Sequence, residues 1–102
     1  MTTKRKLLPL LEAEFGPVTF ALFVRAARTQ LELSQTEMAK KLGMARGTLC
    51  DIEKGRQGVS VTLAVKIARK AGLSQEMAVE YCLKDQLARA KIPMDVTIKK
   101  RA

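Results

Sequence analysis

The chain has 102 residues, a formal net charge of +9 at pH 7, no histidine and two cysteines. A chain of this size supports one small domain with a single core, and its basic charge favours a polyanionic partner. The lack of histidine excludes His-based zinc ligation and the Ser-His-Asp and Cys-His forms of catalysis, and two cysteines are too few for a disulfide scaffold or a cysteine-only zinc site, so we expect no enzyme, cofactor or metal site.

Residues 1–17 are expected to form an arm that is first basic and then rich in leucine. One interpretation is a partly disordered tail, and the other is a strap over the core or a segment that docks a partner. The apolar run in this arm is too short and too interrupted for a secretory signal, and no stretch elsewhere approaches the length of a membrane span. We therefore expect a cytoplasmic protein that has no membrane contact.

A first helix is expected at about residues 19–31. Its apolar residues recur every three or four positions, so they lie on one face of the helix. That face predicts packing against a core. The residues on it are Phe20, Phe23, Val24, Ala27 and Leu31.

The next segment predicts two short helices joined by a tight turn. Ser34 can cap the first helix, and Glu37 stands three residues later, which is the spacing of a capping box. Gly43 supplies the positive φ that the end of this helix needs. Leu49 and Ile52 recur three apart, so the second helix turns its apolar face back onto the first. This layout is that of a helix-turn-helix, whose second helix can enter the DNA major groove.

Two further helices complete the predicted all-α architecture of five helices. Ser60 caps a fourth helix and Gly72 stops it. Ser74 then caps a longer fifth helix that reaches toward Lys91, because Pro93 prevents much continuation.

The fifth helix is apolar on more than one side, although a monomeric domain of this size needs one apolar stripe. The additional stripe predicts a subunit interface, with folding back onto the first helix or the arm as the alternative. After Pro93, apolar and polar residues alternate with the period of a short strand, which would have to pair with the arm or with another protomer. The expected homodimer interface comprises Val79, Leu83, Leu87, Val96 and Ile98.

Residues 34–74 resemble, without a gap, the Cro/lambda-repressor type of helix-turn-helix, the Xre family. With the preceding helix at 18–31, the likeness covers over half of the chain. It implies a lambda-repressor-like domain at 18–74, preceded by the arm at 1–17 and followed by a dimerising helix and tail at 75–102. The residues on which the likeness rests are Gln35, Ala39, Gly43, Leu49, Ile52, the ending IEKG at 52–55 and the helix LAVKIARKAGLS at 63–74.

The resemblance implies that the helix at 44–54 enters the major groove of double-stranded DNA. Arg46 at its start is the candidate for base contact, because a guanidinium can donate two parallel hydrogen bonds to guanine; a phosphate contact or a solvated side chain is the alternative. Gln35 resembles the family's glutamine that contacts phosphate. The expected DNA-binding residues are Gln35, Lys40, Ala45, Arg46, Gly47, Thr48, Cys50, Asp51, Lys54 and Arg56.

Three of these positions have interpretations of their own. Ala45 stands where the family has a capping Ser or Thr, which should cost a little helix stability. Asp51 has three interpretations: a hydrogen bond from cytosine, repulsion of phosphates, or an ion pair with Lys54 or Arg56. We favour repulsion or the ion pair over the cytosine contact. Cys50 is interpreted as a small residue tolerated beside DNA rather than as a redox-sensitive thiol, because nothing marks it as reactive.

The resemblance also implies one structural ion pair. In this family an arginine late in the first helix and a glutamate late in the recognition helix meet beneath the surface and fix the angle between the helices. The gapless register places Arg28 and Glu53 on those two positions. We expect the pair to be structural and not catalytic.

The leading hypothesis is a sequence-specific DNA-binding transcriptional regulator, a repressor that binds a two-fold symmetric operator as a homodimer in the cytoplasm, at the nucleoid. The alternative is an antitoxin that binds a toxin protein and represses its own operon, since the last helix and strand also resemble small Xre antitoxins. A third hypothesis is a helix-turn-helix that has lost DNA binding and only scaffolds proteins, which a flat salt dependence would indicate.

Overall fold

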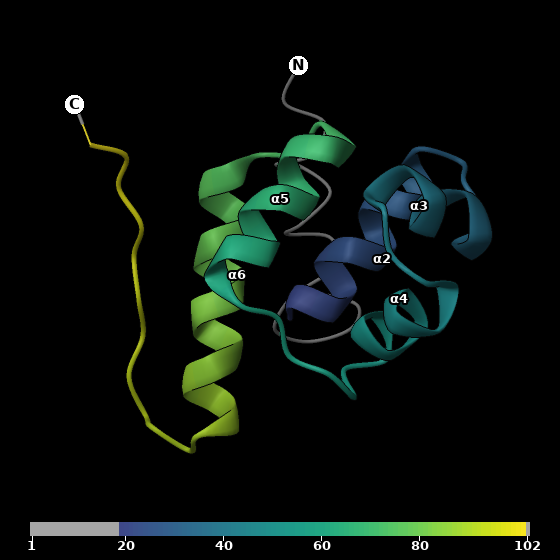
Figure 1. Ribbon diagram of the computed structural model, residues 1–102. Coiled ribbons are helices and arrows are strands. Elements are labelled where there is room, and N and C mark those ends of the chain that lie inside the picture. Colours follow the sequence, from purple (N-terminus) through teal and green to yellow (C-terminus); the bar gives the residue numbers. More distant parts are fainter. Residues whose placement is uncertain (1–18, 102) are drawn as a thin grey trace.

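The computed structural model describes residues 19–101, which form five α-helices and, within that range, no strand (Figure 1). The predicted all-α fold is therefore confirmed. The arm predicted at residues 1–17 lies outside the described residues. The helices are α2 (Phe20–Gln30), α3 (Gln35–Leu42), α4 (Arg46–Glu53), α5 (Val61–Ala71) and α6 (Gln75–Arg89).

Three helices, α3, α5 and α6, begin at the serines that the sequence marks as caps, and α3 and α5 end at the predicted glycines. The Glu37 N–H donates to Ser34 Oγ at 3.1 Å and the Ser34 N–H donates to Glu37 Oε1 at 2.8 Å, so the capping box of α3 is present. The bond from the Ser34 backbone lowers the pKa of the Glu37 carboxyl, and the Ser34 hydroxyl adds to this effect. The Ser60 and Ser74 hydroxyls cap α5 and α6 by accepting the N–H groups of Leu63 and Met77, without the reciprocal bond of a capping box. Gly43 ends α3 with a φ of 72°, as predicted.

The core lies where the five helices meet, with α2 in contact with both α4 and α6. Further contacts join α3 to α4 and α5, and α5 to α6. Because α4 packs on both α2 and α3, these two helices fix how its outer face is presented. The largest fully buried side chains are Val24, Met38, Leu49, Ile52, Ile67 and Cys82.

Two expectations about apolar residues need correction. Leu31 was expected on the inner face of the first helix, but it is 38% exposed because it is the C-cap, where the chain leaves α2. The expected strand near Val96 and Ile98 is absent from residues 19–101, where these residues belong to an extended tail. A strand needs a second strand to satisfy its backbone N–H and C=O groups, and no other part of the described chain supplies one.

The tail of residues 92–101 runs back along α6 (Figure 1). The Ile98 N–H donates to Glu80 Oε1 of α6 at 3.4 Å, and Asp95 Oδ1 lies 3.7 Å from Lys84 Nζ. Burial lowers the pKa of Lys84, but its hydrogen bond to Glu80 and the charges of Glu80 and Asp95 outweigh this and raise it. A few polar contacts therefore hold the tail against α6.

Candidate nucleic-acid interface

A polar cluster holds the C-terminal end of α4 against α2 and the start of α3. Arg28 Nε lies 2.8 Å from Glu53 Oε2, and Arg28 Nη2 lies 3.1 Å from Glu53 Oε1, so the ion pair is bidentate. Arg28 Nη1 also donates to the Leu33 carbonyl at 3.1 Å. The Glu53 side chain is 2% exposed and that of Arg28 is 21% exposed. The contact expected between these two residues is therefore present.

Gln35 belongs to the same cluster, which sequence reasoning missed. Its Nε2 donates to Glu53 Oε1 at 3.2 Å, so the Glu53 carboxylate accepts bonds from both α2 and α3. A buried carboxylate is tolerated when its oxygens are paired and hydrogen-bonded, and this one meets both conditions. The Gln35 amide, expected at a phosphate, thus points inward in this structure.

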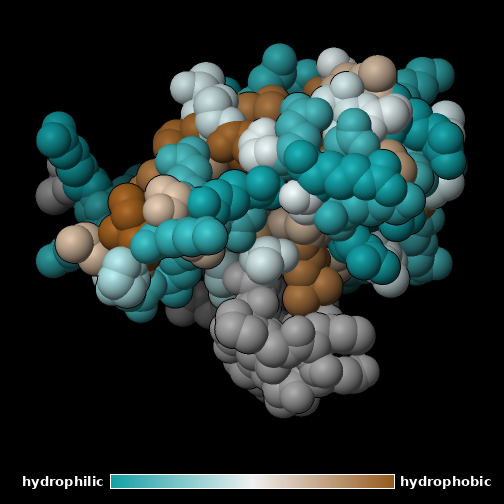
Figure 2. All heavy atoms as spheres, turned by 90° about the horizontal axis from the view of Figure 1, so that it is seen from below, coloured by the Kyte–Doolittle hydropathy of each residue, from teal (hydrophilic) through white to brown (hydrophobic). Residues whose placement is uncertain are grey.

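The expected DNA-binding residues lie on α3, on α4 and on the turns that bound them. Seen from below, most of the surface on the side of α3 and α4 is hydrophilic, whereas hydrophobic residues gather toward the side of α6 and the tail (Figure 2). None of the set is fully buried. The exposed members are Lys40, Ala45, Arg46, Gly47, Lys54 and Arg56, and the half-buried ones are Gln35, Thr48, Cys50 and Asp51.

The start of α4 lacks a side-chain cap. Ala45 is the N-cap residue and has no side-chain oxygen to accept the first N–H groups of the helix. Arg46 is exposed, and no hydrogen bond or ion pair holds its side chain to another part of the described chain. The start of α4 therefore combines unsatisfied N–H donors, the positive end of the helix dipole and an available guanidinium, all of which suit an anionic partner.

Gly47 leaves bare backbone on the outer side of α4. Apart from its chain neighbours and the backbone of its own helix, a Cβ atom built on Gly47 would meet no atom of the described chain within 4 Å. Glycine inside a helix costs about 0.5–1 kcal/mol relative to alanine. Packing within the described chain therefore gives no reason for glycine at this position.

The other charged residues beside α4 are tied only weakly. Asp51 Oδ1 lies 3.4 Å from Arg56 Nη1, and their side chains are 43% and 62% exposed. This is one of the pairings that the sequence suggested for Asp51. Exposed ion pairs contribute about 0–1 kcal/mol, so a phosphate can compete with Asp51 for the Arg56 guanidinium.

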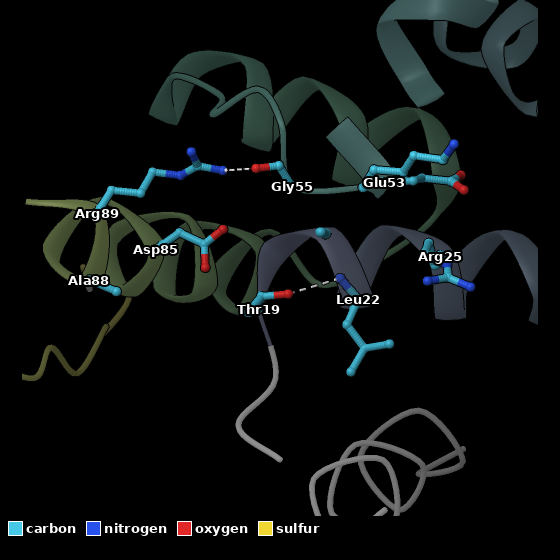
Figure 3. Close-up of a pocket in the computed structure, with 10 residues that line it drawn as sticks. Thr19, Leu22, Arg25, Glu53, Gly55, Asp85, Ala88 and Arg89 are labelled. Atoms are coloured by element: carbon cyan, nitrogen blue, oxygen red, sulfur yellow. Dashed lines mark hydrogen bonds between the residues drawn. The ribbon is translucent and has the colours of Figure 1, made fainter. Parts of the chain in front are cut away.

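A groove lies between the end of α4, the start of α2 and the last turns of α6 (Figure 3). Arg89 Nη2 donates to the Gly55 carbonyl at 2.8 Å, and Asp85 Oδ2 accepts the Phe20 N–H at 3.3 Å. Burial raises the pKa of the Asp85 carboxyl, and the bond from Phe20 and the charge of Arg89 oppose this only in part. Through these two side chains α6 holds both the turn after α4 and the start of α2.

The residues expected at a homodimer interface lie along α6 and the tail. The α6 members, Val79, Leu83 and Leu87, and the tail members, Val96 and Ile98, are all half-buried. Ile98 and Val79 line one shallow groove. The tail therefore lies beside one end of the additional apolar stripe of α6.

Among the described residues we find neither a candidate metal site nor a candidate membrane span. No three His, Cys, Asp or Glu side chains between residues 19 and 101 are grouped so that they could hold a metal ion. In the same range no helix combines the length and the apolar character that crossing a membrane requires.

Residues 24–76 match the family described as helix-turn-helix. An uncharacterized HTH-type transcriptional regulator of Methanothermobacter thermautotrophicus is 43% identical over 49 residues, which are 48% of this chain and 71% of that protein. A similar regulator of Archaeoglobus fulgidus is 44% identical over 46 residues, which are 45% of this chain and 66% of that protein. One of Methanocaldococcus jannaschii is 48% identical over 44 residues, which are 43% of this chain and 67% of that protein. The chain thus spans about two thirds of the length of these relatives. No solved structure matches it.

Proposed function

Since this chain belongs to the Cro/C1-type (Xre) helix-turn-helix family of DNA-binding transcriptional regulators, which are not enzymes, we propose that it is a sequence-specific repressor that binds a two-fold symmetric operator as a homodimer. The observation that carries this proposal is the outer face of α4. One end of the helix is fixed by Arg28 and Glu53, and the other presents Arg46 and the bare backbone of Gly47. A rigidly placed helix with a small, basic leading end fits a major groove.

In the proposed complex α4 lies in the major groove of double-stranded DNA. Arg46 donates to guanine, and Gly47 allows the backbone to approach the base edges closely. The side chains of Ala45, Thr48 and Cys50 are small enough to line that contact. Phosphates are held around it by Lys40, Lys54, Arg56 and the backbone N–H of Gln35.

Charge supports the proposal. The chain has a formal net charge of +9 at pH 7. Basic proteins gain affinity for DNA by releasing the counterions that surround its phosphates, so binding should weaken steeply as salt rises. Because DNA is the partner, we place the protein in the cytoplasm at the nucleoid.

The test begins with selection of bound sites from random double-stranded DNA. A repressor dimer should select two half-sites related by symmetry and separated by about one helical turn. Arg46→Ala should then weaken the selected site by about 1–3 kcal/mol and relax the preference at one base in each half-site. The proposal fails if the folded variant keeps the affinity and preference of the original protein.

Lys40→Ala provides a contrasting measurement. If Lys40 holds a phosphate, its loss should weaken all sequences alike and reduce the salt slope by about one per protomer. Lys100→Ala removes the same charge from the tail, on a different surface, and is the matched control. It should leave the salt slope close to that of the original protein.

The antitoxin and scaffold alternatives remain predictions. A toxin protein would need an apolar surface, and the α6 stripe that could supply it is half-buried, with the tail beside one end of it. Stable binding of a protein encoded beside this chain would support the antitoxin alternative. Protein binding combined with salt-independent, non-selective DNA binding would support the scaffold alternative instead.

A further inference from the structure

One backbone edge of the tail has no hydrogen-bonded neighbour among residues 19–101. On its inner edge the Ile98 N–H donates to Glu80 Oε1 of α6 at 3.4 Å. In extended chain, successive N–H groups point to opposite edges, so those of Thr97 and Lys99 point away from the Ile98 bond. Neither has a hydrogen-bond partner among the described residues. The outer edge is therefore available to a second strand.

The side chains of the tail already alternate as those of a half-buried strand do. Val96 and Ile98 are half-buried, whereas Asp95, Thr97 and Lys99 are exposed. One face of the extended chain thus rests on the molecule, and the other faces solvent. A second strand added at the outer edge would extend this apolar face sideways.

We infer that in the homodimer two tails pair with each other as antiparallel strands about a two-fold axis at Thr97, so that the occupant of each free edge is a second copy of this chain. The inference rests on the proposed function, because a two-fold symmetric operator calls for a dimer. An antiparallel pair of identical strands is self-complementary, as a closed two-fold interface must be. The ribbon would cover the apolar stripes of both α6 helices.

The charges and the apolar residues select this register. With the axis at Thr97, Asp95 stands opposite the partner's Lys99 and Val96 stands opposite the partner's Ile98. Opposite charges and β-branched residues placed directly across from each other stabilise an antiparallel pair. Centring the axis on Asp95 would instead oppose like charges. A shift of one residue would set the apolar face of one strand beside the polar face of the other.

The directions of the backbone N–H groups favour the same register. Asp95, Thr97 and Lys99 have their N–H groups on the free edge, and antiparallel pairs whose backbones face each other exchange two hydrogen bonds. A two-stranded ribbon alone is marginal in water, so it needs an apolar support. Val96 and Ile98 lie on its underside, and Ile98 already lines a groove with Val79 of α6.

Charge exchange tests the register by sedimentation of the full chain. Lys99→Asp turns two symmetric attractions into repulsions and should raise the dimer Kd about tenfold. Adding Asp95→Lys restores opposite charges across the ribbon but replaces the 3.7 Å contact of Asp95 with Lys84 by a repulsion, so it should recover most, and not all, of the affinity that Lys99→Asp loses. Lys100→Asp changes the net charge equally but stands opposite Met94, so it is the matched control and should change the Kd about twofold or less.

Cross-linking gives an independent measurement. In a Cys50→Ser background, which removes the half-buried native thiol of α4, Thr97→Cys should form an interchain disulfide under mild oxidation, because two-fold symmetry brings the two copies of residue 97 together. Lys99→Cys should not, because its copies stand about four residues apart along the ribbon.

Each remaining outcome overturns the inference. If Lys100→Asp weakens the dimer as much as Lys99→Asp, or the double exchange restores nothing, the register is wrong. A dimer that persists without cross-linking at residue 97 overturns the tail pairing and leaves the proposed function intact. A protein that stays monomeric both alone and on the selected DNA overturns the pairing and the proposed repressor dimer together.

Discussion

The two ends of α4 are built in opposite ways. At the C-terminal end, the Glu53 carboxylate accepts bonds from Arg28 and Gln35, and Arg89 donates to the Gly55 carbonyl just beyond the helix. At the N-terminal end, Ala45 supplies no side-chain cap. The Arg46 side chain there is exposed and makes no hydrogen bond within the described chain. One end is held by the protein, and the other is open to a partner.

The two ends of α4 therefore have different roles: one end orients the helix, and the other is available for contact with a partner. A helix fixed at one end by three elements keeps its direction without using its outer face for stability. The open end can then have residues that stabilise the fold poorly, such as Ala45 at the N-cap and Gly47 in the first turn. We expect substitutions at the fixed end to change stability, and substitutions at the open end to change DNA binding.

Breaking the fixed end should have the largest effect. Glu53→Ala leaves the Arg28 guanidinium without its ionic partner and removes the acceptor of the Gln35 amide. Loss of one member of a buried pair costs about 3–5 kcal/mol, and the partial exposure of Arg28 places the expected loss near 3 kcal/mol. Urea unfolding followed by circular dichroism measures it.

The double substitution Arg28→Met with Glu53→Leu is the control for this prediction. It removes both charges and fills the space with apolar side chains, so it should destabilise much less than Glu53→Ala. A Glu53→Ala protein as stable as the original would mean that the cluster does not hold the end of α4, and the contrast between the two ends would collapse.

At the open end, Gly47→Ala should move stability and binding in opposite directions. Alanine removes the entropic cost of glycine, and its methyl group meets no described atom within 4 Å beyond its neighbours and the backbone of α4, so unfolding should become about 0.5–1 kcal/mol less favourable. The same methyl group would stand between α4 and the base edges, so affinity for the selected site should fall. Thermal unfolding and fluorescence anisotropy on one preparation measure both quantities. Stabilisation with undiminished affinity would show that α4 does not approach DNA there.

Asp51→Ala should have the smallest effect on stability. Its pair with Arg56 is exposed, so the free energy of unfolding should change by about 0.5 kcal/mol or less. Removing the negative charge and releasing Arg56 should tighten binding to all DNA sequences alike. Loss of affinity at a single base position, measured on the selected site and its point variants, would instead identify a cytosine contact by Asp51 and assign it to the open face.

Local signals made much of the fold and part of the candidate site predictable. The capping box of Ser34 and Glu37 and the left-handed end at Gly43 depend on neighbours three or four residues away, and the structure contains both. The resemblance placed Arg28 opposite Glu53, and their side chains are in contact. The residue types on the outer face of α4 follow from helical periodicity once its inner face is known.

Sequence alone determined the helices, their caps and the register of the helix-turn-helix, because these depend on short-range spacing. Tertiary structure decided what long-range contacts require: the inward turn of the Gln35 amide, the bond from Arg89 to Gly55 and that from Phe20 to Asp85. Residues far apart in the sequence meet only after the helices have packed, and no local pattern records which polar atoms then face each other. The tail follows the same rule, because its alternating pattern is that of a strand, whereas a strand forms only where a second backbone lies beside it.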